Sequence, residues 1–323
     1  MRRNYLGILC VPAQLGLLTL AGCGGGGGAS GGGPQPIPPP PPAPTYNNFN
    51  PLGSTTFDAS AARVKVEYRT GQPGTIVEKV VVPFSTTGSP NGMLSYDAAS
   101  KTYTFRGSNF GPAELGGQGC VNGSTFDCYI RNISTFPEML LILKSGAALN
   151  GQPNFTLTYS TFFFGSHSEM SPGPDQVATS TRSYGVTGFK TVPSDLPKTG
   201  TASYLHPQTY VEWVSIDPRQ SSSSTSHSGK ANLTVDFGTG KVTTDLTLIV
   251  AGPSSELQFG PYTGNGSIAK GTSVFSGNIG DNSYTGSFEG AFFGPQAAEM
   301  GYSFLLGKIN GTEQIIGAVI GKR

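Results

Sequence analysis

Charge is scarce in this sequence, and its scarcity excludes one large class of functions. Only 12% of the residues are charged, and Lys and Arg exceed Asp and Glu by one, 20 against 19. Nucleic-acid-binding proteins gather Lys and Arg into a patch or stripe, and none is visible along this chain. Arg2 and Arg3 lie in a segment that we expect to be removed, which takes the net charge from +1 to −1. We therefore expect no nucleic-acid partner.

The usual residue patterns of catalysis and metal binding are also missing. His167, His206 and His227 lie far apart in segments that we predict to be solvated loops, with no acidic residue at zinc-ligand spacing. No G-x-S-x-G elbow, phosphate loop or dinucleotide fingerprint occurs. Glu289 and Glu299 could face each other across a hairpin, but we expect both to face solvent. We predict no enzyme, no cofactor and no metal site.

The first 23 residues have the pattern of a bacterial lipoprotein signal. Two arginines precede an apolar run over residues 6–20 that is too short to span a bilayer as a mature helix. Residues 20–23, LAGC, resemble the lipobox, which predicts cleavage after residue 22 and diacylglyceryl and palmitate-type acyl chains on Cys23. Gly24 fits delivery to the outer membrane. The alternative is a soluble secreted protein whose cleavage site happens to precede a cysteine.

Only four cysteines occur, which limits disulfide chemistry to one pair. Cys10 leaves with the signal and Cys23 is acylated, so Cys120 and Cys128 remain. An even pair in an exported chain predicts a disulfide, which stabilises by about 2.5 kcal/mol on the chain-entropy model.

Residues 23–50 predict a tether. Residues 24–33 are almost pure glycine and residues 34–44 almost pure proline, so a flexible coil leads into a semi-rigid segment of about 30 Å. It could lift a binding domain off the membrane, or it could be a spacer that only clears the acylation machinery.

Over the whole chain, glycine and proline are abundant, at 47 and 25 residues, and aromatic residues reach 10%. This composition favours turn-rich all-β structure, and the length suggests about two domains. Alternation over residues 63–68 and 101–106 and a β-branched run over 76–82 predict strands. Residues 137–149 could be a short helix or a buried strand. Residues 155–164 end in three phenylalanines, which predicts a strand buried on both faces.

The hairpin over residues 284–306 organises the C-terminal part. Tyr284, Phe288 and Phe292 alternate with two glycines, which is how the inward face of a small closed sheet is filled. A Gly-Pro break and a compact turn follow, and Tyr302 and Phe304 resume the alternation. A second hairpin spans residues 231–250, and further strands over 268–270, 274–279 and 314–320 bring the total to roughly eight. Eight strands close a barrel filled by side chains or holding one small ligand.

The sequence of the closing hairpin, GSFEGAFFGPQAAEMGYSFLL, resembles that of the closing hairpin in the lipoprotein β-barrels of the transferrin-binding protein B family. Tyr302 stands where that family usually has a second glycine, and residues 194–204 and 231–240 extend the resemblance. It implies a small β-rich handle domain over residues 51–190 and an eight-stranded lipocalin-like barrel over 191–323. It also implies a non-catalytic surface lipoprotein that binds a host or nutrient protein and serves an outer-membrane transporter. Full members carry two such lobes and this chain holds one, which makes transferrin itself a doubtful ligand.

Trp213, the only tryptophan, lies near Tyr204, His206 and Tyr210, and such amphipathic side chains are typical of a protein-contact surface. Trp213 could instead cap the barrel core. The leading hypothesis is an accessory receptor for a protein that carries metal, iron or haem. Two alternatives are a periplasm-facing small-solute binder that uses the barrel cavity, and a structural envelope lipoprotein.

Overall fold

The computed structural model describes most of the chain beyond residue 41. The described residues are 42–49, 52–69, 76–85, 94–116, 125–131, 137–147, 156–170, 177–204, 208–215, 223–226, 228–251, 256–311 and 313–323. The predicted signal segment, Cys23, the glycine stretch, residues 34–41 of the proline stretch and Cys120 lie outside these ranges, so their roles stay predictions. Cys128 is described and is buried.

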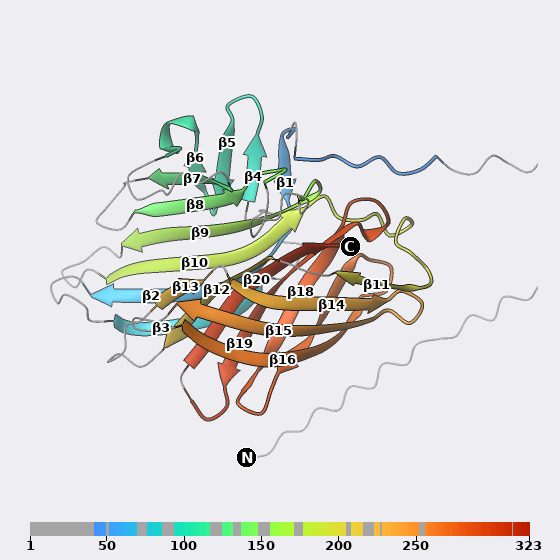
Figure 1. Cartoon of the computed structure of the whole chain (residues 1–323). Coiled ribbons are helices and arrows are strands. Elements are labelled where there is room, and N and C mark those ends of the chain that lie inside the picture. Colours follow the sequence, from blue (N-terminus) through green and yellow to red (C-terminus); the bar gives the residue numbers. More distant parts are fainter. Residues whose placement is uncertain are drawn as a thin grey trace, which may run out of the picture. The chain divides into compact units, whose positions relative to one another are not determined.

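Residues 43–323 form one compact unit built from antiparallel strands (Figure 1). Short 3-10 turns, η1 (Pro112–Glu114) and η2 (Pro295–Ala297), are the helical elements of the described part. Within those residues no helix has the length and apolar character needed to cross a membrane.

Two sheets make up the part of the chain before residue 190, which we call the handle. The smaller sheet has the order β1 (Thr55–Phe57), β4 (Leu94–Asp97), β5 (Thr102–Phe105), β6 (Ser108–Phe110). The larger has the order β3 (Ile76–Ser85), β2 (Ala59–Arg69), β10 (Val177–Gly188), β9 (Ser160–Met170), β8 (Glu138–Leu143), β7 (Phe126–Arg131). The undecided segment over residues 137–149 therefore contains a strand, β8, and its described residues 137–147 contain no helix.

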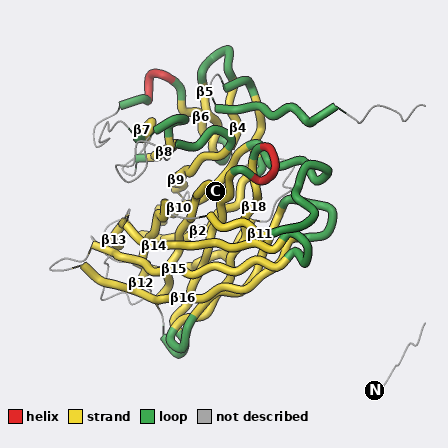
Figure 2. Tube along the Cα trace, turned by 45° about the vertical axis from the view of Figure 1, so that its right-hand side comes forward, coloured by secondary structure: helices red, strands yellow, loops and turns green. Residues whose placement is uncertain are grey.

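The larger sheet is the middle layer of the molecule, with the smaller sheet on one face and the barrel on the other (Figures 1 and 2). Its strand β9 shows why three consecutive phenylalanines are useful there. Phe162 packs toward the barrel strand β20, while Phe163 points the opposite way and packs against Phe105 of the smaller sheet. The prediction of a strand buried on both faces is confirmed.

The remaining strands form one curled sheet. Its order is β11 (Thr201–Tyr204), β14 (Ser228–Asp236), β15 (Lys241–Ala251), β16 (Glu256–Ile268), β17 (Val274–Gly280), β18 (Tyr284–Phe293), β19 (Glu299–Lys308), β20 (Glu313–Lys322), β12 (Gln208–Ser215), β13 (Ser223–Ser226).

The two ends of this order are two halves of the same strand pair, and that closes the barrel. β11 pairs with β14 and β12 pairs with β13 in one continuous register, from Thr201 opposite Asp236 to Val214 opposite Ser223. β12 also pairs with β20 along its other edge. Counting β11–β12 and β13–β14 as one strand each, the barrel has eight strands, as the sequence predicted.

Aromatic side chains fill the barrel interior. Phe288 and Phe292 are buried, and their rings lie 6.2 and 4.9 Å from the ring of Phe275. Tyr302 is also fully buried and its hydroxyl lies 2.9 Å from Thr244 Oγ1. The predicted alternation along residues 284–306 is therefore the inward face of the barrel.

Strand β20 is buried on both faces because it lies between the barrel interior and the handle. Ile315 and Val319 belong to the interior cluster. Ile316, Ala318 and Ile320 pack against the middle layer instead. A strand in such a position needs a near-continuous apolar run, which explains the sequence IIGAVI over residues 315–320.

Candidate functional site

The handle contains an open cleft of about 500 Å³ between the smaller sheet and the outer edge of the larger one. One wall comes from β4, β5 and η1, and the other comes from β7 and β8. Its lining residues are Phe49, Leu52, Tyr96, Lys101, Tyr103, Pro112, Leu115, Asp127, Tyr129, Ile142, Leu143, Lys144 and Ser145. This volume, and a lining of aromatic, aliphatic and charged residues, are suited to binding a small molecule or a few side chains of a partner protein.

Three tyrosines join the two walls of the cleft. The rings of Tyr96 and Tyr103 lie 4.7 Å apart, and those of Tyr103 and Tyr129 lie 5.7 Å apart with their edges and faces in contact. Burial raises the pKa of both Tyr103 and Tyr129, so these phenols stay protonated at neutral pH. They offer rigid, amphipathic contact area and neutral hydroxyl groups rather than charge.

Charge enters at the margin of the cleft. Lys144 Nζ lies 3.4 Å from Asp127 Oδ1, and both side chains are well exposed. Lys101 is exposed, and Leu115 exposes 47% of its surface, the largest fraction among the bulky apolar residues of the described part. An aromatic centre with a charged, partly apolar rim is the usual composition of a protein-contact surface.

The segment that enters the handle from residue 42 is fastened at two points. The ring of Phe49 stacks on Phe57 at 5.4 Å and packs on Phe189 at 5.3 Å. The Tyr46 hydroxyl donates to Asp195 Oδ2 at 2.6 Å and accepts a bond from the Val192 amide at 3.0 Å. Burial and the bond to Asp195 raise the pKa of Tyr46 to about 12.

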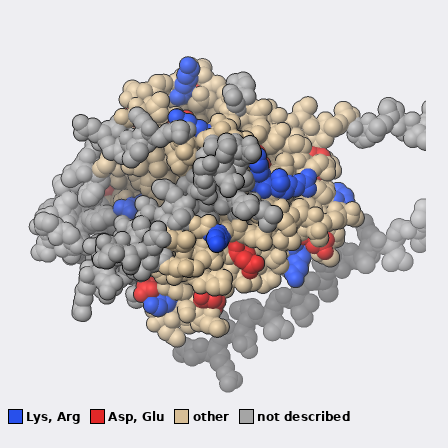
Figure 3. All heavy atoms as spheres, viewed as in Figure 1, with Lys and Arg blue, Asp and Glu red and all other residues tan. Residues whose placement is uncertain are grey.

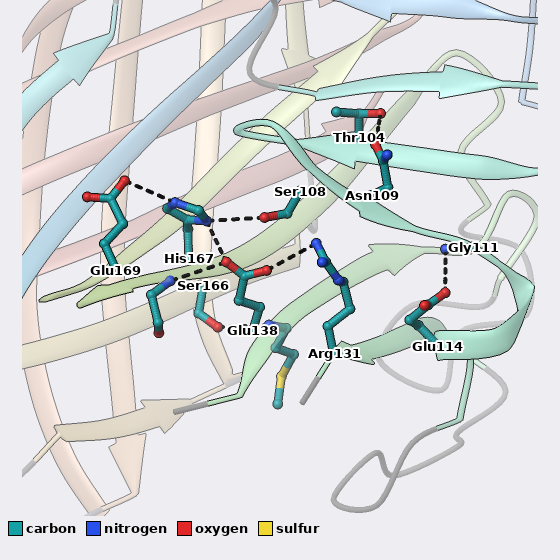
Figure 4. A network of polar contacts seen from close by, with 12 residues as sticks. Thr104, Ser108, Asn109, Gly111, Glu114, Arg131, Glu138, Ser166, His167 and Glu169 are labelled. Atoms are coloured by element: carbon teal, nitrogen blue, oxygen red, sulfur yellow. Dashed lines mark hydrogen bonds and ion pairs between the residues drawn. The ribbon is translucent and has the colours of Figure 1, made fainter. Parts of the chain in front are cut away.

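A polar network links the two handle sheets (Figure 4). Its centre is Glu138 of β8, whose side chain is fully buried. His167 Nδ1 of β9 lies 2.6 Å from Glu138 Oε1, and Arg131 Nη1 of β7 lies 3.4 Å from Oε2. Ser108 of the smaller sheet places its hydroxyl 3.3 Å from the same His167 nitrogen. A buried carboxylate needs such partners, because an unpaired one is costly.

This network corrects one sequence-based expectation. We expected His167 in a solvated loop, but it lies in strand β9 with 17% of its side chain exposed. Its second ring nitrogen, Nε2, lies 3.1 Å from Glu169 Oε1. His227 and His206 lie outside the described residues.

A second correction concerns Glu299, which we expected to face solvent. Its carboxylate is buried and accepts bonds from the amides of Thr158, Tyr159 and Ser160 at 2.6, 3.0 and 2.8 Å, and from the Ser160 hydroxyl at 2.7 Å. Burial raises the pKa of Glu299, while these four bonds act in the opposite direction. Because Glu299 begins barrel strand β19, this carboxylate ties the barrel to the handle segment that leads into β9.

The residues predicted to bind a ligand do not meet in one described site. Tyr204 is fully buried, and its hydroxyl donates to the Ala297 carbonyl at 2.6 Å inside the barrel. Tyr210 and Trp213 lie in β12 opposite Ala318 and Ile315 of β20, and their side chains are outside the described part. Their ligand-binding role stays a prediction.

Sequence reasoning missed the tyrosine cleft altogether. In the sequence, Tyr103 is one residue of an alternating strand, and Tyr129 belongs to no recognisable motif. The cleft exists because β5 and β7, which lie in different sheets, are brought face to face. Within the described ranges, no group of three or more His, Cys, Asp or Glu side chains is placed to hold a metal ion.

A closed eight-stranded barrel with a two-sheet handle packed on its wall defines a handle-and-barrel lobe. Residues 196–323 match the family described as the C-lobe and N-lobe beta barrels of Tf-binding protein B. The barrel of this chain is therefore similar to the barrels of transferrin-binding protein B, as its closing hairpin indicated. No curated protein matches the chain.

Solved structures with a similar arrangement include transferrin-binding and lactoferrin-binding proteins. A transferrin-binding protein B variant from Haemophilus parasuis Hp5 is 15% identical, with a TM-score of 0.45 over 83% of this chain and 45% of that one. The isotype 1 protein from serogroup B Neisseria meningitidis is 17% identical, with a TM-score of 0.41 over 82% and 43%. The N-lobe of lactoferrin-binding protein B from Moraxella bovis is 14% identical, with a TM-score of 0.37 over 81% and 99%. This chain thus spans less than half of the first two proteins.

Proposed function

We propose that this chain is a non-catalytic outer-membrane lipoprotein, anchored through Cys23 and exposed at the cell surface, that binds a protein carrying iron or haem. It acts as an accessory receptor that serves an outer-membrane transporter. The match of residues 196–323 to the barrels of transferrin-binding protein B supports this class of function. The observation that carries the proposal is the tyrosine-lined cleft of the handle, with exposed Leu115 at its rim.

Binding in the cleft is tested with two matched substitutions. Leu115→Asp places a charge on the rim, and Ile309→Asp does the same at an apolar residue of similar exposure, 44%, in the turn between β19 and β20. The purified full chain is immobilised and exposed to iron-loaded transferrin, lactoferrin and haemoglobin as probes. We expect one probe to bind, and Leu115→Asp to weaken it at least about tenfold, since burying an unpaired charge at an interface costs more than 1.4 kcal/mol.

Three results would count against the proposal. Binding of no probe above background would favour a structural envelope lipoprotein. Equal losses in both variants would place the contact outside the cleft. Protection of the handle from protease on intact cells, with cleavage only after lysis, would place the chain in the periplasm. Cleavage on intact cells is the expected result.

The alternative of a solute binder that uses the barrel cavity is not favoured by the packing. A solute-binding barrel would leave space at its inward positions. Here the rings of Phe288 and Phe292 are instead buried among Phe275, Tyr302 and Tyr204. A Cβ at Gly290 would lie 2.5 Å from Tyr302 Cβ, so this glycine leaves no void beside the rings. The middle of the barrel is a packed core.

A further inference from the structure

Two partly buried arginines belong to the two facing sheets of the handle. Arg63 follows Ala59 and Ala61 on the face of β2 that packs against the smaller sheet. Arg106 lies in the turn between β5 and β6. Phe105, which precedes Arg106, lies against Gly165, since a Cβ on that glycine would lie 2.4 Å from Phe105 Cζ, and Gly165 is the cross-strand partner of Ser183. Burial is the main cause that lowers the pKa of Arg63, and the positive charge of Arg106 is the second cause.

Buried donor atoms without a partner gather at this point. The Nε atoms of Arg63 and Arg106 are buried and have no hydrogen-bond partner among the described residues, and the same is true of Ser183 Oγ. Ser183 is the cross-strand partner of Arg63, so the two side chains stand next to each other on the same face of the sheet. Ser183 itself is fully buried.

Nearby carboxylates are engaged elsewhere. Glu138 is bound to His167 and Arg131, and His167 also contacts Glu169. Over the described ranges, no Asp or Glu lies within ion-pair distance of Arg63 or Arg106. Like charges that converge beside unpaired donors disfavour the folded state unless an acceptor with negative charge lies between them.

We infer that Arg63, Arg106 and Ser183 form a binding site for a small oxyanion, a phosphate, sulfate or carboxylate group, beneath the β5–β6 turn of the handle. Two guanidinium forks and a hydroxyl are the donors that such a group accepts, and guanidinium groups match its geometry better than ammonium groups do. The site does not rest on the proposed function, because it involves neither the cleft nor a protein ligand. The anion can be free in solution or a group on a larger molecule, and the shared chemistry is the oxyanion itself.

The test compares Arg106→Gln with Lys101→Gln in the purified full chain. Both substitutions remove one positive charge from a handle turn, and both residues have a positive φ, 49° and 56°. Inorganic phosphate, sulfate and acetate are titrated at constant ionic strength set with sodium chloride, and the melting temperature and the heat of binding are measured. Far-UV circular dichroism checks the fold, and Ser183→Ala serves as a second site variant.

We expect a saturable rise in melting temperature for the wild type and for Lys101→Gln. In Arg106→Gln the apparent affinity should fall at least about tenfold, because a charge-assisted bond is lost. Ser183→Ala should also weaken binding. A response to acetate would assign the site to carboxylates, and a response only to phosphate and sulfate would assign it to tetrahedral anions. No saturable response in the wild type, or the same response in Arg106→Gln, would overturn the inference.

Discussion

Gly290 and Tyr302 are cross-strand partners in the closing hairpin, and the glycine makes room for the tyrosine. A Cβ on Gly290 would lie 2.5 Å from Tyr302 Cβ and 2.8 Å from Phe275 Cζ. Tyr302 stands where the family usually has glycine, and its hydroxyl is satisfied by Thr244 inside the barrel. The departure is thus accommodated by a glycine on the neighbouring strand.

Gly290→Ala should therefore destabilise the barrel. Adding a methyl group to a packed interior costs about 1–3 kcal/mol. The matched control is Gly307→Ala on strand β19, where an added Cβ meets nothing closer than Thr285 O at 3.8 Å. Urea unfolding should show a loss for the first variant and a change within about 0.5 kcal/mol for the second. Equal midpoints for the two variants would contradict this account of the hairpin.

Glu299→Gln should loosen the connection between barrel and handle. The amide keeps the shape of the side chain, but its NH2 group replaces one carboxylate oxygen. That group then faces either the Thr158 amide or the Tyr159 and Ser160 donors, because one carboxylate oxygen accepts from the first and the other oxygen from the second. Leaving such groups unpaired costs about 1.5–3 kcal/mol. Glu169→Gln, whose side chain is 70% exposed, should change the free energy of unfolding by less than about 1 kcal/mol. A loss in Glu299→Gln no larger than in this control would show that the junction does not depend on the carboxylate.

His167→Ala should destabilise the handle by about 3 kcal/mol, because it leaves the buried Glu138 carboxylate with Arg131 as its remaining side-chain ion partner. The double variant His167→Ala/Glu138→Gln removes the buried charge as well. It should be less destabilised than the sum of the two single variants, and the difference is measured in a double-mutant cycle. Strict additivity would mean that the two side chains are not coupled.

Asp195 should contribute to the loss of stability in acid. Burial raises its pKa, but bonds from Tyr46 and Gln296 outweigh burial and hold the pKa below its ordinary value of 3.8. The folded state therefore releases this proton more readily than the unfolded state does. Its stabilisation is present above pH 3.8 and is lost as the pH falls through the lowered pKa.

Melting temperatures between pH 6 and pH 2.5 test this directly. The acid limb should be shallower in Asp195→Asn than in the wild type. Asp245→Asn, an exposed aspartate on β15, serves as the control and should leave the limb unchanged. Parallel limbs in the wild type and Asp195→Asn would remove Asp195 from the explanation.

The sequence predicted the barrel well because its signal is local. Aromatic residues and glycines at every second position specify an inward face, and Phe162 and Phe163 specify a strand with two buried faces. The handle network left no such signal. Glu138, His167 and Glu299 look like surface residues in the sequence. The two glutamates are buried and His167 is mostly covered, because partners more than 25 positions away satisfy them. The cleft was missed for the same reason, since Tyr103 and Tyr129 meet only when two sheets stack.

The attachment of Tyr46 and Phe49 has a mechanical consequence. A pull on the chain ahead of residue 46 does not act first on β1, which has only three residues and would peel away one pair at a time. It acts on the Tyr46 bonds to Asp195 and Val192, and then on the stacked ring of Phe49. The Tyr46 contacts lie where the handle chain leads into the barrel, so the load reaches this connecting segment before the ring of Phe49 passes it to Phe57 of β1.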